Sequence, residues 1–180
     1  MKRCFWVDDN SEIYKKYHDE EWGVPCHNDK DLFELLILES FQAGLAWIIV
    51  LKKRDAFRNA FDNFDIDKII SYDENKINEL LQNEGIIRSR SKINAAINNA
   101  KIFKQIQQEY GSFDKYIWGF TNGKIIKNTN DQFQVSTPLS DKISKDLKKR
   151  GMKYVGTVII YSYLQAIGVI DDHETTCFKY

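Results

Sequence analysis

Four residues near the two ends of the chain have the types and spacing of metal ligands. Cys4 and His18 form a C-x13-H pair near the start, and His173 and Cys177 form an H-x3-C pair near the end. Two thiolates and two imidazoles make a closed tetrahedral Zn2+ site, which is the usual form of a structural zinc. Such an ion would join both ends, so the chain between them must be a single body whose ends meet.

Two other interpretations of these residues remain open. C-x13-H is not a common zinc-finger spacing, whereas H-x3-C is better, because residues four apart share a face of a helix. The four residues could still be buried cysteines and hydrogen-bonded histidines without any metal. The chain has three His and three Cys, which leaves Cys26 and His27 side by side near a predicted loop. They could be ligands instead, or surface residues. We favour the four terminal residues.

A carboxylate in the segment LESFQAGLAW could bind a ligand. Glu39 lies among leucines on an otherwise apolar helix, and Trp47 follows shortly after. A carboxylate there must face solvent, be paired, or line a polar pocket, because burying it unpaired is costly. An exposed glutamate on an amphipathic helix is the commoner case. A buried one beside aromatic rings would suit a flat, hydrogen-bonding, cationic ligand.

The segment LKKRGMKYVGTVIIYSYLQA predicts a helical hairpin with an anion site. Ser140 can cap a first helix, Gly151 stands where a C-cap glycine belongs, and a second helix begins at Thr157 after Gly156. Free backbone N–H groups and the helix dipole favour an anion at such a helix start. The flanking cations are Lys148, Lys149, Arg150 and Lys153. This pattern is typical of a clamp on a phosphate backbone, although an ordinary helix pair with a solvated basic face would look the same.

The remaining elements that would position these residues are also expected to be helical. Ser11 can cap a short helix that carries Tyr17 and His18. Asp29 or Asp31 opens a long apolar stretch, and Gly44 indicates a joint from Gln42 to Leu45.

Further along the chain, Asp65 and Asp73 are expected to cap two short helices, the second ending before Gly85. A long helix is predicted over residues 90–110 from its apolar periodicity, followed by a short aromatic helix over FDKYIWGF. Residues 122–138 are polar with turn signals and are predicted to be a loop. The predicted fold class is all-α.

Length and composition place limits on function. The 180 residues are enough for one domain with a real core, and 13% are aromatic. Net charge is zero, so a general polyanion binder is not indicated and any nucleic-acid contact needs a local basic patch. There is no 18-residue apolar run and no signal-peptide core, so no membrane partner is expected. Three cysteines fit a reducing compartment, and we expect a cytoplasmic protein.

Taken together, several motifs closely resemble the 3-methyladenine DNA glycosylase I family over the whole chain. They are RCFWV, YKKYHDEEWGVP, LFELLILESFQAGLAWIIVLKKR, GIIRSRSKI, SKDLKKRGMKYVGT and DHETTC. The resemblance implies a helix-hairpin-helix glycosylase fold, with residues 1–180 as one domain of two helical lobes. It implies a monofunctional N-glycosyl hydrolase that flips 3-methyladenine out of alkylated double-stranded DNA and releases the free base, leaving an abasic site. A monomer is expected.

The resemblance also implies roles for individual residues. It places structural zinc on Cys4, His18, His173 and Cys177, and base recognition with catalysis on Glu39. The implied pocket aromatics are Tyr17, Trp47 and Trp6. The implied DNA contacts are Gln42, Gly44 and Leu45 in a turn that probes the duplex, and Lys149, Arg150, Gly151, Gly156 and Thr157 in the hairpin. Ala46 departs from the Ser of many relatives, and Asp171 and Asp172 are not assigned a catalytic role.

Two other classes of protein are compatible with these residues. A non-catalytic helical DNA-binding module stapled by zinc would bind DNA without needing Glu39. A zinc enzyme would instead need an open position at the metal, which four protein ligands would exclude.

Overall fold

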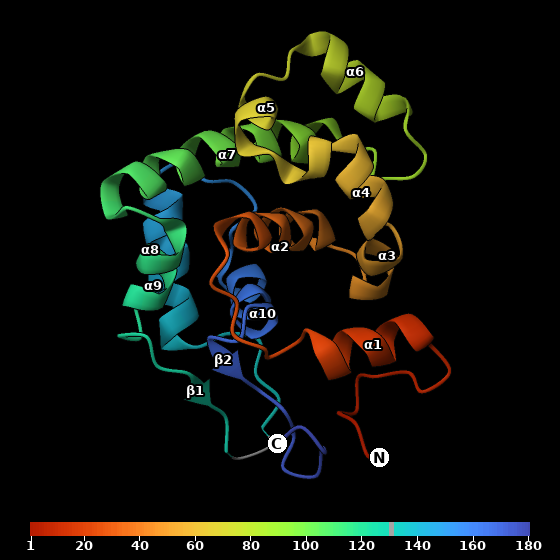
Figure 1. The fold of residues 1–180 in the computed structure, drawn as a ribbon, viewed down its shortest axis with the longest axis vertical. Coiled ribbons are helices and arrows are strands. Elements are labelled where there is room, and N and C mark those ends of the chain that lie inside the picture. The colour runs from red at the N-terminus through yellow and green to blue at the C-terminus, as the bar shows by residue number, and fades with distance from the viewer. Residues whose placement is uncertain (130–131) are drawn as a thin grey trace.

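The computed structural model describes residues 1–129 and 132–180 and is mostly helical (Figure 1). The helices in chain order are α1 (Glu12–Glu20), α2 (Asp29–Gln42), α3 (Trp47–Lys52), α4 (Arg54–Ala60), the 3-10 helix η1 (Asp62–Phe64), α5 (Ile66–Ile70), α6 (Glu74–Gln82), α7 (Arg90–Tyr110), α8 (Phe113–Gly119), α9 (Pro138–Lys149) and α10 (Thr157–Ala166). Two short strands, β1 (Ile126–Lys127) and β2 (Ile170–Asp171), complete the set. The prediction of a mainly helical chain is confirmed.

Several helix ends lie where the sequence predicts them. The Asp65 side chain accepts a hydrogen bond from the Lys68 backbone at 3.1 Å, and Asp73 accepts one from Lys76 at 2.9 Å. The long helix α7 spans the predicted 90–110 and ends at Gly111, whose φ of 87° is left-handed. Glycine adopts that conformation without the steric penalty of a side chain.

Three predicted helix starts differ in detail from the structure: α2 begins at Asp29 and Ser11 stands at the N-cap of α1, as predicted, but the predicted Ser140 cap of α9 is wrong. Asn28, and neither Asp29 nor Asp31, caps α2 by accepting from the backbone of Lys30 and Asp31. Thr137 caps α9, while Ser140 sits at the third helical position and completes a capping box with it. Ser11 does precede α1, but its side chain makes no cap hydrogen bond.

The predicted loop over residues 122–138 is not entirely irregular. Within it β1 pairs in parallel with β2, so that Ile126 lies opposite Ile170. Pro138 belongs to α9, because proline fits the first turn of a helix, where its missing N–H is not needed. Residues 130 and 131 of this segment lie outside the described part of the chain.

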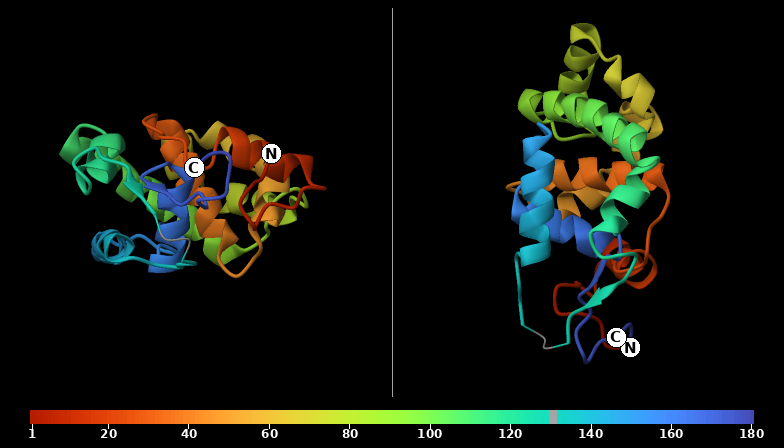
Figure 2. Two further views of the ribbon diagram at one scale, coloured as in Figure 1. Left: turned by 90° about the horizontal axis from the view of Figure 1, so that it is seen from below. Right: turned by 90° about the vertical axis from the view of Figure 1, so that its left-hand side faces the viewer.

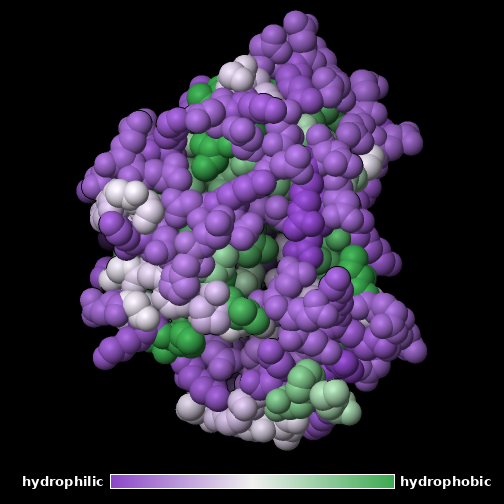
Figure 3. Space-filling model, viewed as in Figure 1, coloured by the Kyte–Doolittle hydropathy of each residue, from purple (hydrophilic) through white to green (hydrophobic). Residues whose placement is uncertain are grey.

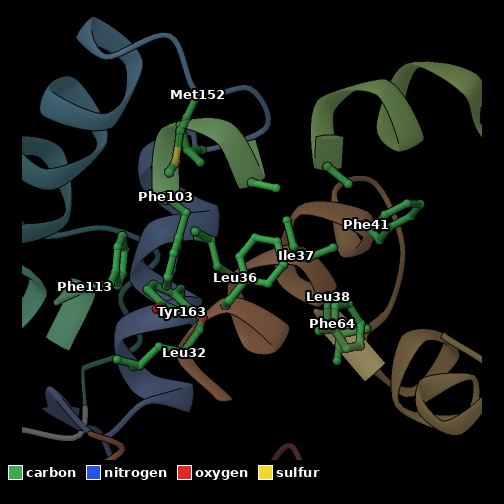
Figure 4. Packing of buried hydrophobic residues seen from close by; sticks show 14 of the residues in the cluster. Leu32, Leu36, Ile37, Leu38, Phe41, Phe64, Phe103, Phe113, Met152 and Tyr163 are labelled. Atoms are coloured by element: carbon green, nitrogen blue, oxygen red, sulfur yellow. Dashed lines mark hydrogen bonds between the residues drawn. The ribbon is translucent and has the colours of Figure 1, made fainter. Parts of the chain in front are cut away.

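Helix α2 forms the centre of the molecule. In Figure 1, α7 lies across its upper side and α10 lies below it. The residues of α2 from Leu32 to Phe41 are buried except Leu35, since neighbours cover several of its faces. Figure 4 shows this core, where Leu36 and Ile37 of α2 pack among aromatic side chains. The Tyr163 hydroxyl of α10 donates to the Leu32 carbonyl at 3.0 Å, which anchors α10 to α2.

The two chain ends lie at the same end of the molecule (Figure 2). The Phe178 backbone N–H donates to the Lys2 carbonyl at 2.9 Å, and the Phe5 N–H donates to the Glu174 carboxylate at 3.2 Å. The terminal segments are therefore bonded to each other, as the split ligand set requires.

The face seen in Figure 3 is largely hydrophilic, with hydrophobic side chains in separate patches. Among the described residues, no helix is both long enough and apolar enough to span a membrane.

Gly168 is a position where we expect alanine to be strongly destabilising. Its φ is +72°, and an added Cβ would fall against the Val24 carbonyl carbon and within 2.5 Å of the Pro25 nitrogen. Backbone cannot move aside as a flexible side chain can, so Gly168→Ala should lower the free energy of unfolding by about 3 kcal/mol or more.

Gly123→Ala is the matched control for this prediction. Gly123 has a similar φ of +74°, but no atom lies within 4 Å of its added Cβ. Backbone strain alone should cost it about 1–2 kcal/mol. Urea denaturation of both variants checks the difference, and equal losses would contradict the steric argument.

Candidate active site

A cavity of about 460 Å³ lies between the N-terminal segment, α1, α2, α3 and α10. Its wall contains Trp6, Tyr14, Tyr17, Trp22, Glu39, Gln42, Trp47, Val158, Tyr161, Gln165 and Asp172, among others. The wall thus combines many aromatic rings with a few polar groups, which is the usual make-up of a small-molecule site.

Glu39 lies in the wall of this cavity and not on the surface. Its side chain comes from the third turn of α2, and the residue is only 3% exposed. Among the described residues, no group hydrogen-bonds to its carboxyl. Burial raises the pKa of Glu39 to about 8. Because desolvation penalises the charged form, the site gains from a positively charged or hydrogen-bond-donating ligand beside this carboxyl.

The three aromatic residues predicted for the pocket are brought together around Glu39. The Tyr17 and Trp47 rings lie 5.5 Å apart at an angle of 48°, and the Trp6 ring lies 6.3 Å from Tyr17. Tyr17 is buried, and burial raises its pKa well above the usual value, so its hydroxyl stays protonated. The arrangement forms an aromatic cage with one acidic side chain.

Two buried donors in the cage lack partners. The indole Nε1 atoms of Trp6 and Trp47 are buried and make no hydrogen bond within the described structure. Both residues line the cavity. Indole nitrogen only donates, so these two groups are suited to acceptor atoms of a bound ligand.

The sequence did not identify several residues of the wall. Tyr14 lies one helical turn before Tyr17, and its hydroxyl accepts a hydrogen bond from the Ile48 N–H at 3.2 Å, which fixes the start of α3. Trp22 also lines the cavity. Phe133 lines the rim and contacts Phe5 edge to face at 6.1 Å.

The two aspartates near the C-terminus have different surroundings. Asp172 lies in the cavity wall and accepts hydrogen bonds from the Tyr161 hydroxyl at 2.7 Å and from the amides of Gln165 and Asn128. Asp171 instead lies 2.8 Å from the Nδ1 of His173. Hydrogen bonds to these partners therefore hold both carboxylates in place.

Three of the four predicted metal ligands meet at one point. The ligand atoms of Cys4, His18 and Cys177 all lie within 4.8 Å of one another, and all three residues are buried. The His173 ring lies next to them, 5.2 Å from the ring of His18, but it is not part of this three-residue group. Cys26 and His27 lie outside the group, and His27 stacks on Trp118 and bonds to Asp114.

Both histidines are oriented as metal ligands commonly are. The Nδ1 atoms of His18 and His173 lie 2.8 Å from Asp19 and Asp171, respectively. A carboxylate on one ring nitrogen leaves the other free to coordinate. The Nε2 of His173 is buried without a partner in the described structure. Its ring lies against Gly23, where a Cβ would come within 2.7 Å of it.

The turn between α2 and α3 is the predicted DNA-probing segment. Gln42 donates from its side chain to the Leu45 carbonyl at 2.7 Å, which closes the turn. Gly44 is exposed and has a φ of +81°, and no atom lies within 4 Å of where its Cβ would be. Gln42 also lines the cavity, so this turn borders the pocket entrance.

The predicted hairpin joins α9 to α10. Gly151 has a φ of +98°, and Gly156 stands at the N-cap of α10 with open space around it. Lys149 is exposed, and Thr157 donates to Asp141 at 2.6 Å. Arg150 is already paired, because its guanidinium binds Asp146 at 2.8 Å and Glu109. The positive charge that is available to a ligand at the hairpin therefore comes from its lysines more than from Arg150.

Comparison with known proteins decides the family. Residues 6–180 match the methyladenine glycosylase family. The chain belongs to this family.

Individual members of the methyladenine glycosylase family are similar over their full length. The chain is 45% identical to DNA-3-methyladenine glycosylase 1 of Escherichia coli, covering 100% of this chain and 97% of that protein. A crystal structure of 3-methyladenine DNA glycosylase I superposes with a TM-score of 0.94 at 46% identity, covering 98% of both chains. A variant of 3-methyladenine DNA glycosylase I in complex with 3-methyladenine superposes with a TM-score of 0.93 at 35% identity, covering 99% of this chain and 97% of that one.

Proposed function

We propose that this protein is a DNA repair glycosylase that hydrolyses the N-glycosidic bond of 3-methyladenine in alkylated DNA and releases the free base. The observation that carries the proposal is the buried Glu39 carboxyl, which has no hydrogen-bond partner in the described structure and faces an aromatic cavity. Full-length relatives with this activity in their names support it.

The chemistry of the lesion fits this cavity. Methylation at N3 gives adenine in DNA a positive charge, so the base is already a good leaving group and needs little acid catalysis. Glu39 as a carboxylate would stabilise that charge, because electrostatic interactions are strong in a site that excludes water. Tyr17 and Trp47 would stack on the base. Normal adenine lacks the charge and would leave the carboxyl uncompensated. Water then adds to the sugar carbon from which the base has left.

The surfaces beside the cavity would hold the duplex. The turn from Gln42 to Leu45 borders the pocket, where it can probe the stack and fill the gap left by the flipped base. At the hairpin, the backbone of Gly151, Gly156 and Thr157 would contact phosphates, with Lys149 nearby. Arg150 would act there chiefly through its backbone, since its side chain pairs with Asp146.

We further propose that Cys4, His18, His173 and Cys177 hold a structural Zn2+. The converging thiols, the two carboxylate-oriented histidines and the unpartnered Nε2 of His173 fit such an ion. Arg3 binds Asp19 at 2.7 Å and lowers the pKa of that carboxyl to about 2, so Asp19 stays ionised beside His18. Four protein ligands leave no open position, so the ion would supply stability and no chemistry.

Incubation of the purified protein with methylated duplex DNA tests the function. Free 3-methyladenine should appear in the supernatant, detected by chromatography, and unmethylated DNA should yield none. Salt-dependent DNA binding without base release would instead identify the non-catalytic DNA-binding module. That the protein is a cytoplasmic monomer, and that residues 1–180 form one domain of two lobes, stay predictions.

Trp47→Ala should weaken binding of free 3-methyladenine. Stacking of one base on an aromatic side chain contributes about 1–3 kcal/mol, which is about 5- to 150-fold in Kd. Isothermal titration calorimetry measures the change. Ile49→Ala is the control, because Ile49 lies on the same helix, is 40% exposed and is not in the cavity wall. An unchanged Kd for Trp47→Ala would contradict stacking on this ring.

A further inference from the structure

Helix α7 contacts both segments that are proposed to hold DNA, and one lysine near its start touches both. Lys92 donates from its ammonium group to the carbonyls of Phe41 at 2.8 Å and Ala43 at 2.7 Å. These carbonyls belong to the end of α2 and the start of the probing turn. Carbonyl groups at a helix C-terminus lack helical partners and attract a cation, so Lys92 fixes how the turn leaves the helix.

The same ammonium group faces the hairpin. It lies 5.9 Å from the centre of the Tyr154 ring, within range of a cation–π interaction. Tyr154 has a left-handed φ of +54°, an unfavourable conformation for a tyrosine that its surroundings must hold. Its hydroxyl lies 2.9 Å from the Oγ of Ser91, the residue before Lys92.

Two helical turns further along α7, an asparagine holds the rest of the hairpin turn. The side chain of Asn99, which is fully buried, donates to the Lys153 carbonyl at 2.8 Å and accepts from the Lys153 N–H at 2.9 Å. Residues 92 and 99 lie on one face of a helix. One side of α7 (Figure 1) therefore sets the separation between the probing turn and the hairpin.

A role as an ordinary surface lysine does not explain Lys92. Lysine side chains usually keep their ammonium group in water, and ordering one costs conformational entropy. Lys92 is half-buried instead, and burial lowers its pKa. The hydrogen bonds to the two carbonyls offset this cost, and they hold both carbonyls in one place.

We propose that Lys92 is a positioning residue for base excision, which sets the spacing between the probing turn at Gln42–Leu45 and the hairpin at Gly151–Thr157. This inference rests on the proposed function. A duplex held at both segments presents its lesion to the cavity at a position determined by that spacing, and small misplacements reduce rates strongly.

The test replaces Lys92 by methionine, which keeps the apolar stem and removes the ammonium group. Base release under single-turnover conditions at saturating enzyme should slow by about tenfold or more. The Kd of free 3-methyladenine should stay within about twofold, because the cage residues do not contact Lys92. Lys92→Arg should restore much of the rate, since a guanidinium can also donate to two carbonyls. Lys101→Met, an exposed lysine of the same helix, should behave as wild type.

A second DNA substrate distinguishes a positioning role of Lys92 from a non-specific effect of the substitution on the protein structure. When methylated adenines face mismatched bases, extrusion is easier, so the Lys92→Met defect should shrink. Wild-type rates for Lys92→Met, an equal defect on both substrates, or a parallel loss of free-base affinity would each overturn the inference. If the wild-type protein releases no base, the proposed function itself fails, which is a separate result.

Discussion

Glu39→Gln is expected to remove most base release while making the protein more stable at alkaline pH. Glutamine keeps the shape of the side chain but cannot carry the charge that would stabilise a cationic base. Removing one preorganised electrostatic group from an enzyme site commonly costs about 10²–10³-fold in rate. Single-turnover release from methylated DNA measures this loss.

The stability gain follows from the pKa. Burial raises the pKa of Glu39 from 4.5 to about 8, so between these values the folded state binds a proton that the unfolded state has lost. The free energy of unfolding therefore falls as pH rises through that window, and the full cost is present above pH 8. Glutamine has no such cost, so the variant should gain on the order of 4 kcal/mol at pH 9 relative to pH 5.

Glu34→Gln is the control for this prediction. Glu34 is also buried on α2, but it binds the Arg58 guanidinium at 2.7 Å. Its replacement should destabilise the protein, because it removes the buried ion pair and leaves Arg58 only the exposed Asp55 as a partner, and should spare base release. Denaturation curves at both pH values distinguish the variants. A Glu39→Gln protein that is no more stable at pH 9 would show that Glu39 is not held in an unfavourable charged state.

Removal of the proposed zinc is expected to lower the melting temperature by about 10–20 °C. The ion would join segments that are otherwise bonded by a few hydrogen bonds, such as Phe178 to Lys2. Structural zinc contributes directly to folding, and a loss of about 5 kcal/mol corresponds to such a shift in a protein of this size. Calorimetry before and after chelation measures it.

Cysteine variants test the same site without a chelator. Cys177→Ser should reduce the zinc content and the melting temperature, whereas Cys26→Ser should retain one zinc per chain, because Cys26 lies outside the cluster. Elemental analysis of purified protein counts the metal. Equal melting temperatures with and without chelator, or zinc lost from Cys26→Ser instead, would contradict the assignment.

Features encoded within short segments could be predicted from the sequence. Helix α7 has a clear apolar period and a terminal glycine, and Asp65 and Asp73 are local caps, so their positions depend little on the rest of the fold. The convergence of Cys4, His18 and Cys177 was also predictable, since few residue types bind zinc and the chain has few of them.

Other features that depend on distant contacts could not be predicted. Asp29 has the residue type of a cap for α2, yet its carboxylate accepts from the N–H groups of Phe113 and Asp114 at the start of α8. Asn28 caps α2 in its place. Likewise, no local pattern shows that Phe133 reaches the rim of the cavity, because that position depends on the path of the whole segment before α9.

The bonding of the first residues to the last has a consequence for how the protein is made. Trp6 and Tyr17 leave the ribosome early in synthesis, but His173 and Glu174, which complete the wall beside them, are translated only after α10. A nascent chain therefore cannot complete its binding site until the segment after α10 has been synthesised. A polypeptide truncated between α10 and His173 would keep its helices but would lack this part of the cavity wall.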